Sequence, residues 1–187
     1  MPPPDGAPTV REVRWSDFED LVATYYHLYE ERETDPEIGI TLFARPPTRA
    51  DEVKWFSDLY GRVASGGTVM RVAETGGHVV GHCVIERLGP TEDSELAHVG
   101  VLGLLVDHAH RGRGIGSALM REALAASRGK FDLVRLSVFA SNERARALYS
   151  RFGFVPYGHL PASVRRGGRY LDLDLMWLDL RAPDAKG

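Results

Sequence analysis

The residues with the clearest chemical potential lie between Val99 and Leu124, where an apolar run ends at Val106 and a glycine-rich segment follows. This segment reads Arg-Gly-Arg-Gly-Ile-Gly over residues 111–116 and leads into a helical pattern. Glycines lack Cβ, so the backbone can approach a ligand closely, and the free N–H groups at a helix start carry partial positive charge. The arginines add fixed charge and paired donors. A strand, a glycine turn and a helix in this order indicate a site for an anion such as pyrophosphate.

Three kinds of phosphate-binding turn compete for this segment. A P-loop needs a lysine after its last glycine, and none follows here. The Rossmann fingerprint needs a third glycine, but Ser117 or Leu119 holds that place, depending on the glycine from which the spacing is counted. The spacing of Arg111, Gly114 and Gly116 instead resembles Gln/Arg-x-x-Gly-x-Gly/Ala, the acetyl-CoA signature of the GNAT family of N-acetyltransferases.

A second segment, downstream of the first, is similar to another signature of the same family. Residues 142–154 read Asn-x-x-Ala-x-x-Leu-Tyr followed by Gly-Phe. Asn142 suits the N-terminus of a helix, and Gly153 can end that helix in a left-handed conformation. The apolar positions between them share one helical face. Two motifs in the expected order make the resemblance specific.

The resemblance implies an α/β fold of mixed α+β type. This would be a single GNAT-like domain with a splayed mixed β-sheet of about seven strands, flanked by about four helices. The sheet would open between the strand ending at Val106 and the strand ending near Phe139, with acetyl-CoA in the gap. In the family, the pantetheine amides pair with the splayed strand, here Leu104, Leu105 and Val106. Gly103 would mark a bulge in that strand.

The resemblance also implies which residues hold acetyl-CoA, the expected co-substrate. The pyrophosphate would lie against backbone N–H groups of the glycine turn, and Asn142 would help to hold the cofactor or an ordered water. Arg151 is an outside candidate for phosphate contact, and a solvated helix face is the simpler interpretation of it. The cofactor-binding residues expected are Leu104, Leu105, Val106, Arg111, Gly112, Arg113, Gly114, Ile115, Gly116, Ser117, Asn142, Arg146 and Tyr149.

The chemistry implied is direct attack of a neutral amine on the acetyl thioester. Such a reaction must remove a proton from the ammonium, stabilise an oxyanion and protonate the departing thiolate. By resemblance, a backbone N–H beside Val106 would stabilise the oxyanion. Tyr149 occupies the family's usual general-acid position, with a core tyrosine that packs its helix as the alternative.

The general base is where the sequence departs from the better-known members. The two positions where they carry a glutamate are Gly100 and Ser137 here. His98 lies two residues before Gly100, so the period of a strand places both on one face, with room beside the glycine. A histidine titrates near neutrality and can accept a proton directly or through water. A strand histidine without catalytic duty is the competing interpretation. The reserve candidates are Glu95, His82 and Glu86.

Hydrophobic periodicity predicts the elements that must position these residues. We expect helices over residues 17–33 and 48–65, above the substrate, a further helix after the glycine turn, and another formed by the second motif itself. We expect strands over residues 9–14, 69–74, 78–87, 96–106, 133–139, 155–159 and 169–180. One domain would span residues 9–181, with frayed ends at residues 1–8 and 182–187.

Length, composition and net charge limit the classes of protein to which this chain can belong. A chain of 187 residues with 43% apolar content suits a single core, and no apolar run approaches the roughly 20 residues of a membrane span. The single cysteine, Cys83, excludes an internal disulfide, and the start lacks signal-peptide features. With 23 basic and 26 acidic residues, the net charge of −3 gives no nucleic-acid signature. We expect a cytoplasmic monomer or homodimer without nucleic-acid or membrane partners.

Two further clusters carry weaker signals. His98, His108 and His110 crowd one region, but their spacing matches no common zinc motif, so no metal is expected. Five carboxylates between residues 30 and 37 weakly favour a cationic acceptor, although a solvated surface explains such a run as well. Residues 165–170 would form the opposite lip of the acceptor site or a dimer contact.

The expected function is therefore transfer of an acetyl group from acetyl-CoA to a primary amine. The acceptor classes open to it are a small-molecule amine, a lysine side chain and a peptide N-terminus. The alternative is a non-catalytic domain that binds acetyl-CoA as a sensor or scaffold, which the missing glutamates make conceivable. Amine-dependent release of thiol distinguishes the two.

Overall fold

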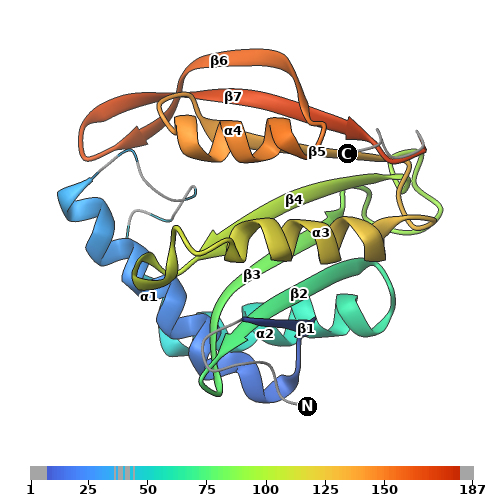
Figure 1. The fold of residues 1–187 in the computed structure, drawn as a ribbon, viewed down its shortest axis with the longest axis horizontal. Coiled ribbons are helices and arrows are strands. Elements are labelled where there is room, and N and C mark those ends of the chain that lie inside the picture. Colours follow the sequence, from blue (N-terminus) through green and yellow to red (C-terminus); the bar gives the residue numbers. More distant parts are fainter. Residues whose placement is uncertain (1–7, 36, 38–39, 41–42, 44, 182–187) are drawn as a thin grey trace.

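The computed structural model describes residues 8–35, 37, 40, 43 and 45–181, which form a seven-stranded sheet between two pairs of helices (Figure 1). The sheet order is β1-β2-β3-β4-β5-β7-β6. The strands are β1 (Thr9–Glu12), β2 (Thr68–Thr75), β3 (His78–Arg87), β4 (Val99–Val106), β5 (Leu133–Phe139), β6 (Val155–Arg166) and β7 (Arg169–Asp179). The helices are α1 (Phe18–Thr34), α2 (Arg49–Ala64), α3 (Ile115–Ser127) and α4 (Glu143–Arg151), with short 3₁₀ turns η1 (Trp15–Asp17) and η2 (His108–His110). The expected fold class is confirmed.

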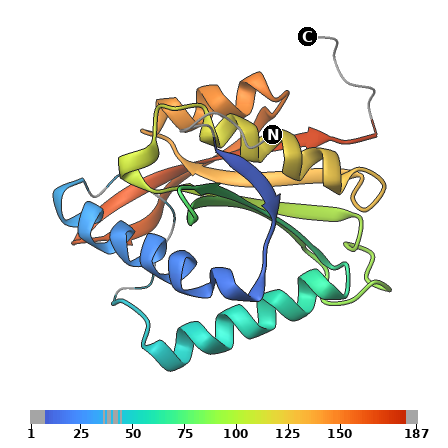
Figure 2. The same cartoon turned by 60° about the horizontal axis from the view of Figure 1, so that its bottom comes forward.

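The two faces of the sheet bury separate cores. Helices α1 and α2 cover one face, and α3 and α4 cover the other (Figure 2). Phe56 of α2 packs with Val72 and Val84 on the first face, whereas Ile85 packs with Leu119 of α3 on the second. Burying one such side chain contributes about 1.5–3 kcal/mol. Successive residues along β3 or β4 therefore point toward different helix pairs. At the site, the two faces of these strands thus have different surroundings.

The feature that opens the sheet is the pairing between β4 and β5, which ends partway along the two strands. β4 and β5 pair in parallel only through Val99–Leu133, Gly100–Val134 and Val101–Arg135. Beyond Val101, β4 stays paired with β3 on its other edge, and β5 stays paired with β7. One edge of β4 is therefore open from Leu102 onward, at the predicted position of the splay.

Two predicted features of β4 are wrong. The strand begins at Val99 rather than at residue 96, because Ala97 donates its N–H to Ser94 O (2.8 Å) and Val99 donates to Leu96 O (3.0 Å), which closes a turn. The bulge expected at Gly103 is absent as well, since the register with β3 runs without a shift past the Val84–Gly103 pair.

β6 is longer than the predicted segment 155–159. The strand continues to Arg166 through a register shift between Leu160 and Val164, where Ala162 has a φ of 53° and donates its N–H to Asp172 Oδ1 at 2.7 Å. This irregularity accommodates Pro161, which lacks a backbone N–H. Of the expected frayed ends, residues 1–7 and 182–187 lie outside the described part of the chain. None of the helices in the described part is long and apolar enough to cross a membrane.

Candidate active site

A cleft of about 700 Å³ occupies the gap where β4 and β5 separate. Its volume falls in the range of small-molecule sites. Most of its lining comes from the two motifs and the two diverging strands. The lining comprises residues 102–106 of β4, 110–112 and 114–117 of the glycine turn, 137–139 of β5, and Ile40, Asn142, Arg144, Ala145, Leu148, Tyr149, Arg151 and Leu173.

The open edge of β4 presents unpaired backbone groups to this cleft. Asp107 donates its N–H to Val80 O at 2.9 Å, and Val99 accepts from Leu88 N–H at 2.8 Å, so the odd-numbered residues face β3. Because backbone groups alternate along a strand, those of Leu104 and Val106 face the open edge. Of the three predicted pantetheine contacts, Leu104 thus offers both of its backbone groups and Val106 offers its N–H, since Val106 O already accepts from Arg111 Nε at 2.8 Å. The backbone groups of Leu105 are turned toward β3.

The glycine turn places helix N–H groups at one end of the cleft. Gly112 and Gly114 have φ values of 83° and 79°, which only glycine adopts without strain. A Cβ on Gly114 would meet nothing within 4 Å, so the turn is open on that side. The first intrahelical bond of α3 runs from Ala118 N–H to Gly114 O (3.0 Å), leaving the N–H groups of residues 115–117 without an intrahelical acceptor. This is a binding geometry for an anion.

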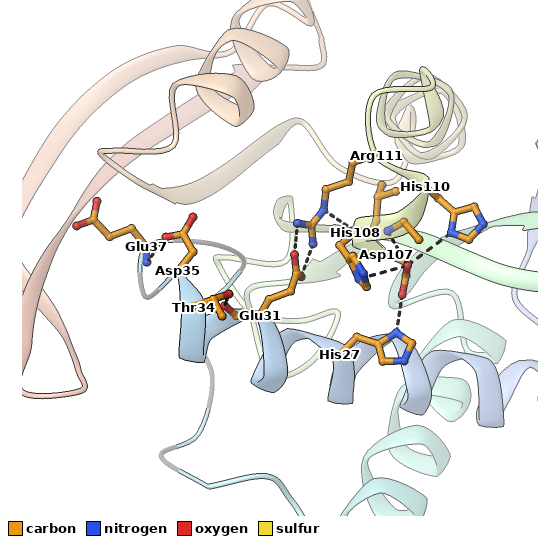
Figure 3. Close-up of polar contacts among 11 residues, drawn as sticks. His27, Glu31, Thr34, Asp35, Glu37, Asp107, His108, His110 and Arg111 are labelled. Atoms are coloured by element: carbon orange, nitrogen blue, oxygen red, sulfur yellow. Dashed lines mark hydrogen bonds and ion pairs between the residues drawn. The ribbon is translucent and has the colours of Figure 1, made fainter.

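The side chain of Arg111 does not point into this anion site. Its guanidinium makes a bidentate ion pair with Glu31 of α1 (2.6 and 2.7 Å), and its Nε donates to Val106 O at 2.8 Å (Figure 3). One helical turn earlier, His27 Nδ1 lies 2.6 Å from Asp107 Oδ2. These two contacts fasten α1 to both ends of η2, in the segment between β4 and α3.

A cluster of potential metal ligands belongs to the same attachment. His27, Asp107 and His108 offer ligand atoms within 4.8 Å of one another, and His110 Nδ1 lies 3.5 Å from Asp107 Oδ1. His98, which the sequence grouped with His108 and His110, lies at the opposite end of β4. Since the close contact of His27 with Asp107 already pairs these two groups, we assign the cluster to holding α1 in place.

The Asp107 contact makes stability dependent on pH. Burial raises the pKa of this carboxyl, but the hydrogen bonds from His27 and Ala109 N–H outweigh burial and hold the pKa below its usual range. A carboxyl with a lowered pKa stabilises the fold above its unfolded pKa of about 3.9 and loses that effect as the pH falls through the folded value. Asp107→Asn should cost about 1–3 kcal/mol of unfolding free energy at pH 7, and the cost should shrink below about pH 4. Urea unfolding at both pH values, with exposed Asp93→Asn as control, measures this; an equal loss at both would contradict it.

The arginines divide differently from the prediction. Arg146 pairs with Asp174 (2.9 Å) and is not among the residues that line the cleft. Arg144 and Arg151, two turns apart on α4, do line it. Arg144 also lies 3.5 Å from where a Gly112 Cβ would be, beside the glycine turn. Arg113 is exposed and outside the lining. Sequence reasoning missed Arg144, although its spacing of seven from Arg151 places both on one helix face.

Tyr149 lines the cleft and is only 7% exposed. Burial raises its pKa far above the usual range, and the neighbouring Cys83 thiol adds to this, so the phenol keeps its proton at neutral pH. Cys83 is the register partner of Leu104, which places Tyr149 near the level of Leu104 along β4.

Asn142, predicted to help hold the cofactor or a water, caps the N-terminus of α4: its side-chain oxygen accepts from Ala145 N–H at 3.0 Å.

The structure does not bring His98 or Glu95 to the cleft. Both are exposed in the turn before β4, and neither lines the cavity. The room expected beside Gly100 is filled as well: a Cβ there would lie 2.6 Å from Ile85 Cγ2 and 3.2 Å from the Phe131 ring. Gly100 therefore faces the apolar core, and the space that was expected to admit a substrate beside His98 does not exist.

His98→Ala and Glu95→Ala should leave kcat/KM within about twofold of wild type, because substitutions on an exposed turn rarely change energies by more than about 0.5 kcal/mol. Steady-state rates with one good amine acceptor would measure this. A loss greater than tenfold in either variant, with the fold intact, would return that residue to the catalytic site.

Arginine side chains partly neutralise the negative charge of the acidic run at the end of α1. Glu31 is paired with Arg111, and Glu37 lies 2.9 Å from Arg169 of the β6–β7 hairpin. The same hairpin donates a hydrogen bond from Arg166 to Ile40 O at 2.6 Å. It thus contacts the segment after α1, and the field of the acidic run is weaker than its composition suggests. Whether residues 165–170 form a lip of the acceptor site or a dimer contact stays a prediction.

Comparisons with known proteins agree with this geometry. A sequence profile described as the acetyltransferase (GNAT) family matches residues 11–154. The L-amino acid N-acetyltransferase AaaT of Escherichia coli is 33% identical over 108 residues, which are 57% of this chain and 65% of AaaT. The N-alpha-acetyltransferase RimI of Mycobacterium tuberculosis is 44% identical over 86 residues, which are 46% of this chain and 51% of RimI. The matched region thus spans less than two thirds of either relative.

Among solved structures, the chain is similar to yncA from Salmonella typhimurium, described as a putative acetyltransferase with its cofactor acetyl-CoA. The TM-score is 0.79 at 22% identity, covering 97% of this chain and 100% of that one. At this identity the likeness establishes a common fold.

Proposed function

The chain belongs to the GNAT family of acetyltransferases, and on this premise we propose that it transfers the acetyl group of acetyl-CoA to a primary amine by direct attack. The observation that carries the proposal is the ladder that ends at Val101–Arg135. Beyond that pair the cleft is lined both by the glycine turn, with its free helix N–H groups, and by the buried Tyr149. These are the groups that a phosphate-bearing thioester substrate requires.

Each part of acetyl-CoA has a matching surface in this cleft. The pyrophosphate fits the N–H groups of residues 112–117, with Arg144 and Arg151 as further donors. The pantetheine amides fit the open edge of β4 at Leu104 and Val106, where they would complete the interrupted ladder. We infer that the thioester lies at the level of Leu104, because Tyr149 approaches β4 there.

The residues of this chain then divide the reaction between them. When bound, acetyl-CoA supplies the activated acetyl group. The Leu104 N–H stabilises the oxyanion as the amine adds to the carbonyl carbon. Tyr149 donates its proton to the departing sulfur, a role that its raised pKa suits because the phenol stays protonated until charge develops beside it.

The acceptor class is a proposal drawn from chemistry shared by the relatives. The names of AaaT and RimI describe acetylation of an L-amino acid and of an N-alpha position, respectively. An α-amine, free or at a peptide N-terminus, is therefore the first acceptor to test, followed by other small amines and lysine side chains. The cytoplasmic location and the monomeric or homodimeric state remain predictions from the sequence.

A turnover assay over such a panel tests the proposal. We expect thiol release from acetyl-CoA that depends on an amine and matches the N-acetyl product one to one by mass spectrometry. Tight binding of acetyl-CoA without amine-dependent thiol release for any member would favour the sensor or scaffold instead.

A further inference from the structure

The two faces of β4 give the two reaction partners different approaches. Tyr149 belongs to the core under α3 and α4, on the same side as Ile85. Gly103 lies directly opposite Val84, which packs with the α1–α2 core on the other side. If the leaving sulfur meets Tyr149 on the first side, the amine must arrive on the second, over Gly103.

The strand surface at Gly103 is bare enough to admit an amine. Gly103 is partly exposed, and only Val84 Cγ1, at 3.3 Å, lies within 4 Å of where its Cβ would be. Because side chains alternate along a strand, His82 and Glu86 share the face of Val84. Their register partners are Leu105 and Val101, so both are diagonal neighbours of Gly103, within reach of a long side chain or a small substrate.

His82 is the group on this face with free hydrogen-bonding capacity. His82 is only partly exposed, its Nδ1 is enclosed, and neither nitrogen bonds to another described residue. It is not among the residues that line the cleft, but its register partner Leu105 and the diagonal neighbour Gly103 both are. Burial lowers its pKa to about 4, so the ring is neutral at pH 7 and keeps a lone pair available. Glu86, in contrast, already lies 3.5 Å from Arg62 of α2.

Resting on the proposed acetyl transfer, we propose that His82 is the general base, accepting the proton of the amine that attacks over Gly103 from the side of α1 and α2. A buried polar group without a partner is unusual in a folded protein and calls for an explanation. A substrate N–H that donates to the ring supplies one. No carboxylate competes for this role at the two positions where better-known relatives carry a glutamate, since they are Gly100 and Ser137.

His82 and Tyr149 together account for the protons that move in the reaction. The amine lone pair forms the N–C bond, the C–S bond breaks, and its electron pair leaves on sulfur. His82 takes the proton released from nitrogen, and Tyr149 gives its proton to sulfur. Transfer of a proton from the imidazolium to the tyrosinate through water restores both groups, and the products are an N-acetyl amine and CoA thiol.

Two substitutions separate this role from a structural one. His82→Gln keeps much of the side-chain volume, and His82→Ala opens a space that free imidazole can enter. We expect kcat to fall at least tenfold in both, acetyl-CoA affinity by calorimetry to stay within about twofold, and added imidazole to restore part of the rate in His82→Ala. His78→Ala, an exposed histidine at the start of the same strand, serves as the matched control and should keep the wild-type rate.

Full turnover by His82→Gln would overturn the assignment, as would a loss in His82→Ala that imidazole does not reverse. His82→Gln provides the measurement if His82→Ala does not fold. The failure of the broader proposal looks different, because the wild-type protein itself would then show no amine-dependent thiol release.

Discussion

Replacing Gly114 with tryptophan should abolish acetyl-CoA binding in a chain that still folds. Gly114 has a φ of 79°, and nothing lies within 4 Å of its missing Cβ, so the indole would extend into the mouth of the glycine turn. There it would displace a pyrophosphate from the N–H groups that begin α3. The left-handed backbone adds a cost of about 1–2 kcal/mol, small beside the typical 5–15 kcal/mol of a folded domain. Calorimetry of a variant with a native circular dichroism spectrum measures the effect.

Gly129→Trp is the matched control for that experiment. Gly129 has a φ of 75° in the turn between α3 and β5, with nothing within 4 Å of where a Cβ would be, so the local strain is alike. It is not among the residues that line the cleft, and acetyl-CoA affinity should stay within about twofold. Unchanged affinity in Gly114→Trp would mean that the glycine turn does not bind the pyrophosphate.

Tyr149→Phe should lower kcat by about 10²–10⁴-fold, the usual worth of a general acid, while acetyl-CoA affinity changes by less than about twofold. The phenol acts on charge that develops on sulfur only as the C–S bond breaks, so its loss affects the transition state more than binding. Because the ring still packs against Phe154 (5.9 Å between centroids), the fold should be retained. Single-turnover rates at saturating acetyl-CoA isolate the chemical step.

Tyr157→Phe, on the exposed surface of β6, controls for the substitution itself and should keep the wild-type rate. Equal single-turnover rates for wild type and Tyr149→Phe would remove Tyr149 from the acid role. Its burial would then reflect packing alone.

The features predictable from sequence are those set by local chemistry. β5 has the predicted bounds of residues 133–139, since buried Val134, Leu136 and Val138 alternate with the more exposed Arg135 and Ser137, which is the period of a strand. Asn142 caps α4 as expected, because its side chain reaches an N–H only three residues away. The positive φ of Gly112 and Gly114 likewise follows from their place between a strand and a helix.

The features that escape prediction depend on contacts between distant parts of the chain. Arg111 is an expected phosphate ligand by motif, yet its guanidinium pairs with Glu31, 80 residues earlier. The alternation of side chains would place His98 on β4 only if the strand began before residue 98. Hydrogen bonds in the preceding turn prevent this, and the strand begins at Val99. The sequence indicates only that His82 and Glu86 share one face of their strand. Their position beside Gly103 follows from the register between β3 and β4, which the sequence does not give.

These long-range contacts also connect the two halves of the proposed site. Helix α1 is attached to the glycine turn at His27 and Glu31, and the segment after it reaches the β6–β7 hairpin through Ile40. An acceptor bound between them would touch elements that are fixed to the cofactor turn. Specificity for the acceptor is thus expected to reside in α1 and the hairpin, outside both sequence motifs.

Hydrogen–deuterium exchange with and without acetyl-CoA tests whether this substrate fills the gap in the sheet. We expect slower exchange at the amides of residues 102–106 and 112–117 when acetyl-CoA is bound, because the open edge of β4 and the free N–H groups of α3 gain partners. The amides of residues 99–101, where β4 is already paired with β5 and β3, should change little. Saturating binding of acetyl-CoA that leaves both of the first two segments unprotected would show that the substrate does not lie between β4 and β5.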